Sequence, residues 1–350
     1  MSGPEAHPAP AYRIMLGKRD ITPLVDARLV SLQLTECRGE EADRLDLTLS
    51  DHDGALEIPA RDATLQVSIG WRGQGLVDKG TFLVDEVEHC GSPDVITLRA
   101  RSAELTQALR TRSEHSYHAT TLGQILTAIA ARHKLEARID DSLAAKAIAH
   151  VDQTNESDVN FVTRLARLHD AVATVKRGKL LFLPILATTT STGLRMPQVL
   201  IDRASGDSHR FHTSDRDAYS GVRAYWHDPK RARRRGVLVG KSGNAKRLRD
   251  SYANEPDARA AAIAEWRRIQ RGAATFELTL ALGVPELAPQ SPVRVTGFKA
   301  QIDELEWLAI RVSHLLGEGG FTTRVELEND VAPNEESGIA SDAEADSATD

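Results

Sequence analysis

The chain has 350 residues, of which 41% are hydrophobic and 27% charged, and this composition excludes a wholly disordered or collagen-like protein. At roughly 150 residues per domain, we expect two or three domains with substantial cores. The formal net charge of -6 comes from residues 330–350, which carry seven acids and no base, so the rest of the chain is nearly neutral.

The N-terminal segment, the apolar runs and the cysteines indicate where in the cell the chain is expected. The opening segment MSGPEAHPAPAYR has no apolar signal core, so we expect synthesis in the cytoplasm. No apolar run approaches the ~20 residues of a membrane helix, so no membrane insertion is expected. Cys37 and Cys90 lie in strand-like runs without metal-ligand spacing. We interpret both as buried thiols, outside any disulfide framework.

Alternating apolar residues over the first hundred positions predict half-buried β-strands. The runs LDLTLSD, TLQVSIGW, TFLVDEVEH and DVITLRA change polarity at every second residue, as a strand with one buried face requires. The turns between them, DHDG at 51–54 and WRGQG at 71–75, are short, so successive strands are expected to pair antiparallel. Residues 1–110 are therefore predicted to form a first tube-like β-barrel.

A helical period replaces this alternation in the next segment. In TTLGQILTAIAARHK the apolar residues recur at helical spacing after Thr120 or Thr121, either of which is a suitable N-cap. A second helix is predicted to start at NESD with Asn155 as its cap, and the strand KLLFLP follows Gly178. Residues 111–187 are therefore expected to form an α+β domain.

The remaining chain returns to strands around one further helix. After the connector TTTSTG, strands are predicted near 198–202 and 220–226. The helix PDARAAAIAEWRRIQRG opens at Pro256 and ends before Gly272, and further strands follow. The expected parts are a second tube-like β-barrel from 188–228 and 273–329, a basic loop and helix insertion at 229–272, and a disordered acidic tail at 330–350.

Four short motifs occur twice in the same order and indicate an internal duplication. LDLTL at 45–49 matches FELTL at 276–280, and FLVDEVEH at 82–89 matches WLAIRVSH at 307–314. A glycine-aromatic strand end precedes each of the latter, and an alternating strand follows. The predicted equivalent structural positions are Gly70, Trp71, Phe82 and His89 in one copy and Gly297, Phe298, Trp307 and His314 in the other. The predicted fold is mainly β with α+β insertions: two related tube-like β-barrel domains plus small α/β domains.

No residue pattern predicts a catalytic, cofactor-binding or metal-binding site. The run from Gly236 to Ser242 resembles a phosphate-binding loop but has three residues between its glycines where four are required. The pairs in HSYH at 115–118 and HRFH at 209–212 lack a nearby cysteine and the spacing of helical metal ligands. Carboxylates that face each other across a cleft are not recognisable from one sequence. We expect no catalytic residue, no cofactor and no metal.

Residues 230–249 contain nine basic residues and no acid. A candidate basic interaction patch lies at the start of this run: Lys230, Arg231, Arg233, Arg234 and Arg235. Runs of this kind contact phosphates in nucleic-acid-binding proteins. Here no aromatic residue is interleaved and no recognition helix is adjacent, which favours a solvated loop or a loop that faces an acidic protein partner.

Three blocks of the chain resemble the late control protein D family of contractile-tailed phages. Members are tail hub proteins, related also to the N-terminal hub part of the valine-glycine-repeat spike proteins of type VI secretion. The blocks are GWRGQGLVDKGTFLVDEVEH, DQTNESDVNFVTRLARLHDAVATVKRGKLLFLP and WLAIRVSHLLGEGGFTTRVELE. The resemblance extends from about Tyr12 to Asn329. No oligonucleotide-binding barrel or β-helical spike follows and the acidic tail is additional, so the spike is expected to be a separate protein.

The resemblance implies a structural baseplate hub and not an enzyme. Such a hub is a homotrimer that joins the hexameric tail tube, or a tube-initiator protein, to the trimeric central spike. Three chains with two similar barrels each would present six similar surfaces around one axis. Other implied partners are further baseplate proteins, with nucleic acid at most in passage through the lumen. After synthesis in the bacterial host cytoplasm, the chain is expected in the virion tail baseplate or injection particle.

Two alternatives remain open from the sequence. A hub-associated cell-wall-degrading enzyme predicts lytic activity that depends on one or two carboxylates. A nucleic-acid-binding regulator that uses residues 230–249 predicts salt-sensitive DNA affinity, lost when Arg233, Arg234 and Arg235 are neutralised.

Overall fold

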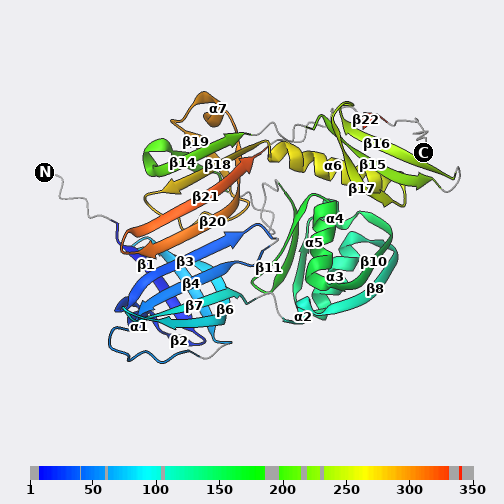
Figure 1. The fold of residues 1–350 in the computed structure, drawn as a ribbon. Helices are drawn as coiled ribbons and strands as arrows, with labels where there is room; N and C mark the ends of the chain where they lie inside the picture. The colour runs from blue at the N-terminus through cyan, green and yellow to red at the C-terminus, as the bar shows by residue number, and fades with distance from the viewer. Residues whose placement is uncertain are drawn as a thin grey trace.

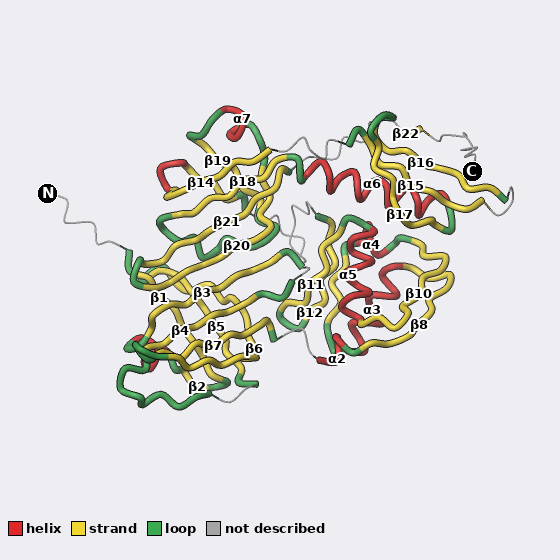
Figure 2. The backbone as a smooth tube through the Cα atoms, viewed as in Figure 1, coloured by secondary structure: helices red, strands yellow, loops and turns green. Residues whose placement is uncertain are grey.

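The computed structural model describes residues 8–39, 41–59, 62–103, 107–185, 197–213, 219–228, 232–330 and 339–340. Its elements gather into four groups, each with its own hydrophobic core (Figure 1). We refer to them as the first β unit, the α+β unit, the second β unit and the basic unit. Strands predominate, and the longer helices lie in the α+β and basic units (Figure 2). The chain is therefore mainly β with α+β insertions, as predicted.

The first β unit contains the strands that the alternation predicts. Leu45 and Leu47 are fully buried, whereas Asp46 and Thr48, which alternate with them, are only half-buried. A short turn with Gly73 at φ 84° joins two long strands. The elements are β1 (Pro10–Leu16), β2 (Arg19–Asp20), α1 (Thr22–Asp26), β3 (Leu29–Cys37), β4 (Arg44–Ser50), β5 (Thr64–Trp71), β6 (Gly75–Cys90) and β7 (Val95–Ser102).

The α+β unit packs its helices against a two-stranded and a three-stranded sheet. The Thr121 hydroxyl accepts the backbone N–H of Gln124, whose side chain in turn accepts the N–H of Thr121, so the predicted cap is confirmed. The elements are α2 (Gln107–Arg110), β8 (Arg112–Thr121), α3 (Leu122–Arg132), β9 (Glu136–Ile139), α4 (Asp141–Ala144), β10 (Ala147–Ser157), α5 (Asp158–Leu168), β11 (Ala171–Lys176) and β12 (Lys179–Pro184).

The predicted cap of α5 was wrong by two residues. Ser157, and not Asn155, accepts the backbone N–H of Asn160 at the start of the helix. Asn155 has φ 48° and lies where the β8–β10 register shifts, so β10 continues past it as a bulged strand. The helix therefore begins only after the bulge.

The second β unit surrounds a core of aromatic and branched residues that includes Phe276 and Trp307. Their ring centroids are 5.4 Å apart. The elements are β13 (Val199–Asp202), η1 (Arg203–Ser205), β14 (Gly206–Thr213), β18 (Ala274–Leu280), β19 (Pro292–Thr296), α7 (Ala300–Asp303), β20 (Trp307–Gly317) and β21 (Gly320–Asn329).

The basic unit differs from the predicted loop insertion. It is a sheet of β15 (Gly221–Asp228), β16 (Arg233–Gly240), β17 (Ala245–Tyr252) and β22 (Ile339–Ala340), with α6 (Glu255–Arg271) on one face. Val222 and Val239 bury one side of this sheet against Ala258 and Ala262 of α6. Because this apolar face holds β15 to β16, residues 221–228 pair here and not with the second β unit. Asn254 caps α6 and Gly272 ends it, close to the predicted bounds.

The two β units share one thirteen-stranded sheet. β3 pairs antiparallel with β20, from Ser31 opposite Gly317 to Cys37 opposite Arg311. Among the described residues we find no closed barrel, so the predicted pair of barrels is seen only as two strand groups joined edge to edge. In the same residues, no helix is long and apolar enough to cross a membrane.

His169 should make the α+β unit sensitive to acid. Both ring nitrogens lie out of solvent without a hydrogen-bond partner in the described ranges, and burial together with Lys146 lowers the pKa of His169 to about 4. The unfolded chain therefore takes up a proton near pH 6.5 and the folded chain only near pH 4, so stability falls as pH drops through this window, by about 3 kcal/mol. Urea unfolding of His169→Gln between pH 7 and 4 should show a pH dependence smaller by that amount. An unchanged profile would contradict this assignment.

Candidate assembly surfaces

The two β units have the same strand order and the same strand directions. In the first, hydrogen bonds link β5, β6, β7, β4 and β3 in that order, and in the second they link β19, β20, β21, β18 and β14. Every neighbouring pair in both series is antiparallel. The strands that correspond carry the repeated sequence motifs: LDLTL and FELTL lie on β4 and β18, and FLVDEVEH and WLAIRVSH lie on β6 and β20.

The residue register is also the same in both units. β6 and β7 shift register between Val84 and Glu86, and β20 and β21 shift between Ala309 and Arg311. A second shift occurs in β3–β4 and recurs in β14–β18. Corresponding pairs include Phe82 with Ser102 and Trp307 with Asn329, Leu45 with Ala100 and Phe276 with Leu327, and Leu34 with Leu45 and Phe211 with Phe276. Because bulges fix register, these ladders equate the strands residue by residue.

The aromatic residues singled out in the sequence are core residues in both units. Phe82 and Trp307 stand at the same ladder position and are 1% and 0% exposed. The ring of Trp71 packs on Phe321 with centroids 5.1 Å apart, and its Nε1–H donates to the carbonyl of Gly283 in the second unit. Phe298 packs edge-on against Phe276.

The predicted glycine equivalence is shifted by one residue. Leu65 faces Phe82 in the first unit and Val293 faces Trp307 in the second. Counting along β5 and β19 from these pairs places Gly297 level with Ile69 and Phe298 level with Gly70. On this count Thr296, the last residue of β19, is level with Ser68, so β19 ends three residues before the level at which β5 ends.

The two histidines share a ladder position but differ in environment. His314 is fully buried, with Nδ1 2.9 Å from the Thr323 hydroxyl. The His89 side chain is 42% exposed and lies 3.5 Å from Asp51. The difference follows from the strand beside each: β3 covers β20 at His314, whereas in the described part of the chain no strand covers β6 at His89.

A buried ion-pair cluster lies at the joint of the two β units. Glu36 on β3 is within 2.6 Å of the Lys79 ammonium and 3.6 Å of the His314 ring, and Lys79 also donates to the carbonyl of Leu287. Lys176 of the α+β unit lies 3.7 Å from the same carboxylate. Burial alone would raise the pKa of Glu36, but His314, Lys79 and Lys176 outweigh it and hold the pKa at about 2. Burial lowers the pKa of His314, so this ring is neutral at pH 7.

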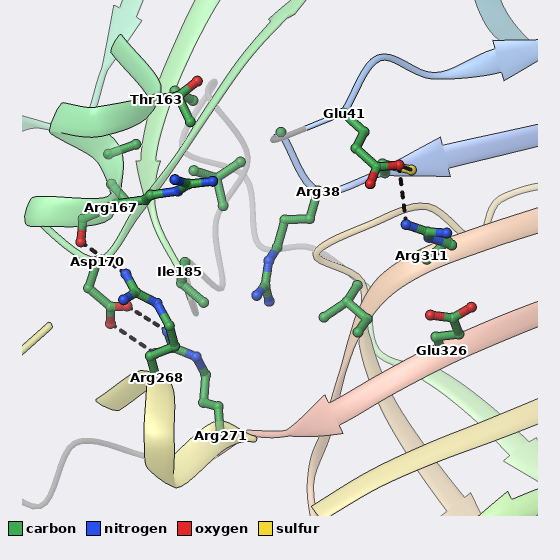
Figure 3. A pocket seen from close by; sticks show the side chains of 17 residues that line it. Arg38, Glu41, Thr163, Arg167, Asp170, Ile185, Arg268, Arg271, Arg311 and Glu326 are labelled. Carbon is green, nitrogen blue, oxygen red and sulfur yellow. Dashed lines mark hydrogen bonds and ion pairs between the residues drawn. The ribbon is translucent and has the colours of Figure 1, made fainter. Parts of the chain in front are cut away.

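A second buried ion pair links the α+β unit, the basic unit and the second β unit. Arg271, 2% exposed at the end of α6, donates two hydrogen bonds to Asp170, at 2.8 and 2.5 Å, and its Nε lies 3.2 Å from Glu328 of β21. Arg38 also pairs with Glu328. Arg38, Asp170 and Arg271 line a cavity of about 330 Å³ among the α+β, basic and β units, where Asp170 and Arg271 face each other (Figure 3). The lining includes two ion pairs, Asp170 with Arg271 and Glu41 with Arg311.

Within the two repeated strand series, two strand edges have no partner in the chain as described. The far half of β6, residues 85–90, pairs only with β7. β14 pairs only with β18. Glu86 and Glu88 on the first edge are 59% and 49% exposed, and His209, Arg210 and His212 on the second are exposed. Cys90 lies at the end of the β6 edge and is exposed, so the prediction of two buried thiols was wrong for this residue. Cys37, on the covered strand β3, is buried as predicted.

The basic patch lies on a strand and has aromatic neighbours. Arg233, Arg234 and Arg235 begin β16, while Lys230 and Arg231 lie outside the described residues. The Arg234 guanidinium lies 4.1 Å from the ring centre of Tyr225 on β15, and that of Arg235 lies 5.7 Å from Trp226. The expectation of a loop without interleaved aromatics was therefore wrong, because the aromatics come from the neighbouring strand.

The sequence reasoning missed the buried charges and the open edges. Glu36 lies two residues after the buried Leu34, and His314 lies between the buried Val312 and Leu316 at the same spacing. A titratable residue at such a core position was the available signal. Arg271 carried no comparable signal. Among the described residues, no group of three or more His, Cys, Asp or Glu side chains is placed to hold a metal ion.

The chain is similar to known proteins in both sequence and fold. A family model described as phage tail baseplate hub (GPD) matches residues 40–320. The chain is 42% identical to a probable baseplate hub protein of Escherichia phage 186, over 94% of this chain and 96% of that protein. It is 44% identical to a probable baseplate hub protein of Escherichia phage P2, over 91% and 93%. A 43 kDa tail protein of prophage MuSo2 from Shewanella oneidensis has the same fold, with a TM-score of 0.68, 15% identity and coverage of 91% and 98%.

Proposed function

The chain belongs to the phage tail baseplate hub family, and from this premise we propose that it is the homotrimeric adaptor between the hexameric tail tube and the trimeric central spike. As a baseplate hub protein it is a structural component of the tail and not an enzyme. The tube or tube-initiator protein, the spike and other baseplate proteins are the partners this proposal assigns to it.

The repeated ladders are the observation that carries the proposal. Two β units with one strand order and the same two bulges are two copies of one interaction surface. Three chains supply six such units, so a threefold assembly meets a sixfold tube without any change in the tube subunits. In this proposal each β unit corresponds to one tube-like barrel domain, and the α+β and basic units lie outside the ring.

Light scattering on the purified protein, alone and with its co-expressed spike, tests the proposal. The expected mass is near three times 38.2 kDa, or about 115 kDa, for the protein alone, or this mass plus that of three spike chains for the complex if the trimer forms only with the spike. A monomer under both conditions would overturn the trimeric adaptor.

The basic face of β15 and β16 is proposed to contact an acidic baseplate protein. Nucleic-acid binding is the alternative that the Arg234–Tyr225 and Arg235–Trp226 contacts keep open, because stacked arginine and aromatic side chains also bind single strands. We expect labelled single-stranded DNA to bind no more tightly than micromolar at 150 mM salt, and replacement of Arg233, Arg234 and Arg235 by Gln to leave the solution mass unchanged. Tight, salt-sensitive binding that the triple variant loses would favour the DNA-binding alternative.

A further inference from the structure

We propose that β14 of one chain pairs antiparallel with the far half of β6 in the next chain, in one fixed register, and that this ladder closes the hub ring. The inference rests on the proposed trimer and adds the surface that holds it together. It concerns two exposed strand edges at opposite ends of the repeated strand series.

The internal joint supplies the pattern for the joint between chains. Within one chain, β3 of the first unit pairs with β20 of the second. The ladders equate β3 with β14 and β20 with β6. If each unit meets the next in the same way around a ring, the contact that β3 makes with β20 is repeated by β14 with β6 of a neighbouring chain. This contact joins two different surfaces, head to tail, so every copy of both surfaces is occupied only when the chains form a closed ring.

The register of the new ladder follows from the internal one. His314 faces Leu34 in the internal joint, and the equivalent residues are His89 and Phe211. The same step along both strands gives four pairs between chains: Val87 with Thr213, Glu88 with His212, His89 with Phe211, and Cys90 with Arg210.

The state of the two edges supports this pairing. His89 is exposed where its equivalent His314 is fully buried, and the missing cover is one strand. Exposed strand edges of this kind pair readily with another chain. The edges also differ in charge: Asp85, Glu86 and Glu88 lie on β6, although they pair with Arg99 and Arg101 of β7. β14 carries one acid, Asp207, and one base, Arg210, and only Arg210 lies within the four proposed pairs.

A disulfide cross-link between chains tests the register, because Cys90 is already an exposed free thiol. Arg210→Cys places a second thiol directly opposite it in the proposed ladder. Residues directly opposite in an antiparallel pair have Cα atoms about 4.5 to 5.5 Å apart, within the range a disulfide spans. After mild oxidation, we expect a reducible covalent trimer near 115 kDa, three times the 38.2 kDa chain, on a denaturing gel.

Matched variants separate register from chance contact. Cys90→Ser with Arg210→Cys should not cross-link, and His209→Cys should not either, because adjacent side chains point to opposite faces. Val87→Cys with Thr213→Cys, in a Cys90→Ser background, tests a pair of the other spacing type, so one unfavourable site does not decide the result.

The outcomes distinguish this inference from the proposed function. Trimers by light scattering that cross-link through neither pair overturn the β14–β6 ladder and leave the trimeric hub standing. Cross-linking by His209→Cys as readily as by Arg210→Cys overturns the register. A chain that is monomeric with and without its spike overturns both.

Discussion

Replacing Lys79 by Met should destabilise the protein by about 3 to 5 kcal/mol, the usual cost of removing one partner from a buried ion pair. Lys79 is 3% exposed and its ammonium lies 2.6 Å from the Glu36 carboxylate, itself 6% exposed. Without it, Glu36 keeps only a neutral His314 and the more distant Lys176. Urea unfolding at pH 7, followed by the fluorescence of the four tryptophans, of which Trp71 and Trp307 lie in the two β units, measures the loss.

Lys179→Met is the matched control, because Lys179 pairs at 3.2 Å with Glu136 while both side chains are substantially exposed. Exposed pairs contribute about 0 to 1 kcal/mol. Combining Lys79→Met with Glu36→Gln should recover part of the loss, since the orphaned charge is then removed. Equal effects of the two Lys variants would contradict the role of the joint.

The same cluster sets an acid limit on the wild-type protein. Glu36 has a pKa of about 2 in the folded state against about 4.5 when unfolded. Its contribution to stability is therefore complete above pH 4.5 and is lost as pH falls toward 2. In Lys79→Met the folded-state pKa of Glu36 should rise toward its unfolded value, so the acid-dependent loss of stability should become smaller than in the wild type.

Replacing Arg271 by Met should have an effect of similar size, about 3 to 5 kcal/mol. Its guanidinium donates two hydrogen bonds to Asp170 and contacts Glu328, and all three residues are buried. The change leaves the buried Asp170 carboxylate without its partner and leaves Glu328 with Arg38 alone, where the α+β unit, the basic unit and β21 meet. Calorimetric unfolding should show the α+β and basic units melting at lower temperature.

Arg268→Met, one helical turn earlier on α6, is the control. Arg268 pairs with Glu265 on the same helix and donates a 3.2 Å hydrogen bond to the carbonyl of Arg167, but its side chain is 46% exposed, so we expect a change of at most about 1 kcal/mol. A loss in Arg271→Met no larger than this would contradict the three-way joint.

The fold was predictable where one face of an element is buried against the rest of the chain. The alternation around Leu45 and Leu47, the helical spacing after Thr121 and the repeated motifs each report a local period, and the strands and helices appear there. β16 escaped detection because its first three residues are arginines, and its apolar residues are only the short run from Val237 to Val239, which shows no alternation.

The joints and edges could not be predicted because they depend on which strands meet. Glu36, Lys79 and His314 come from three strands far apart in sequence, and no period in any one strand announces their contact. Likewise, the sequence marks residues 84–90 as a strand but not as one with an open side. Only the comparison of His89 with its buried equivalent His314 reveals the missing neighbour.

Electron cryomicroscopy of the purified hub with its co-expressed spike, reconstructed without imposed symmetry, tests the central claim most directly. The account predicts three chains whose six β units surround one axis at similar radius, with β14 of each chain beside β6 of the next. A ring of six chains, a twofold dimer, or first and second β units at different radii would contradict it.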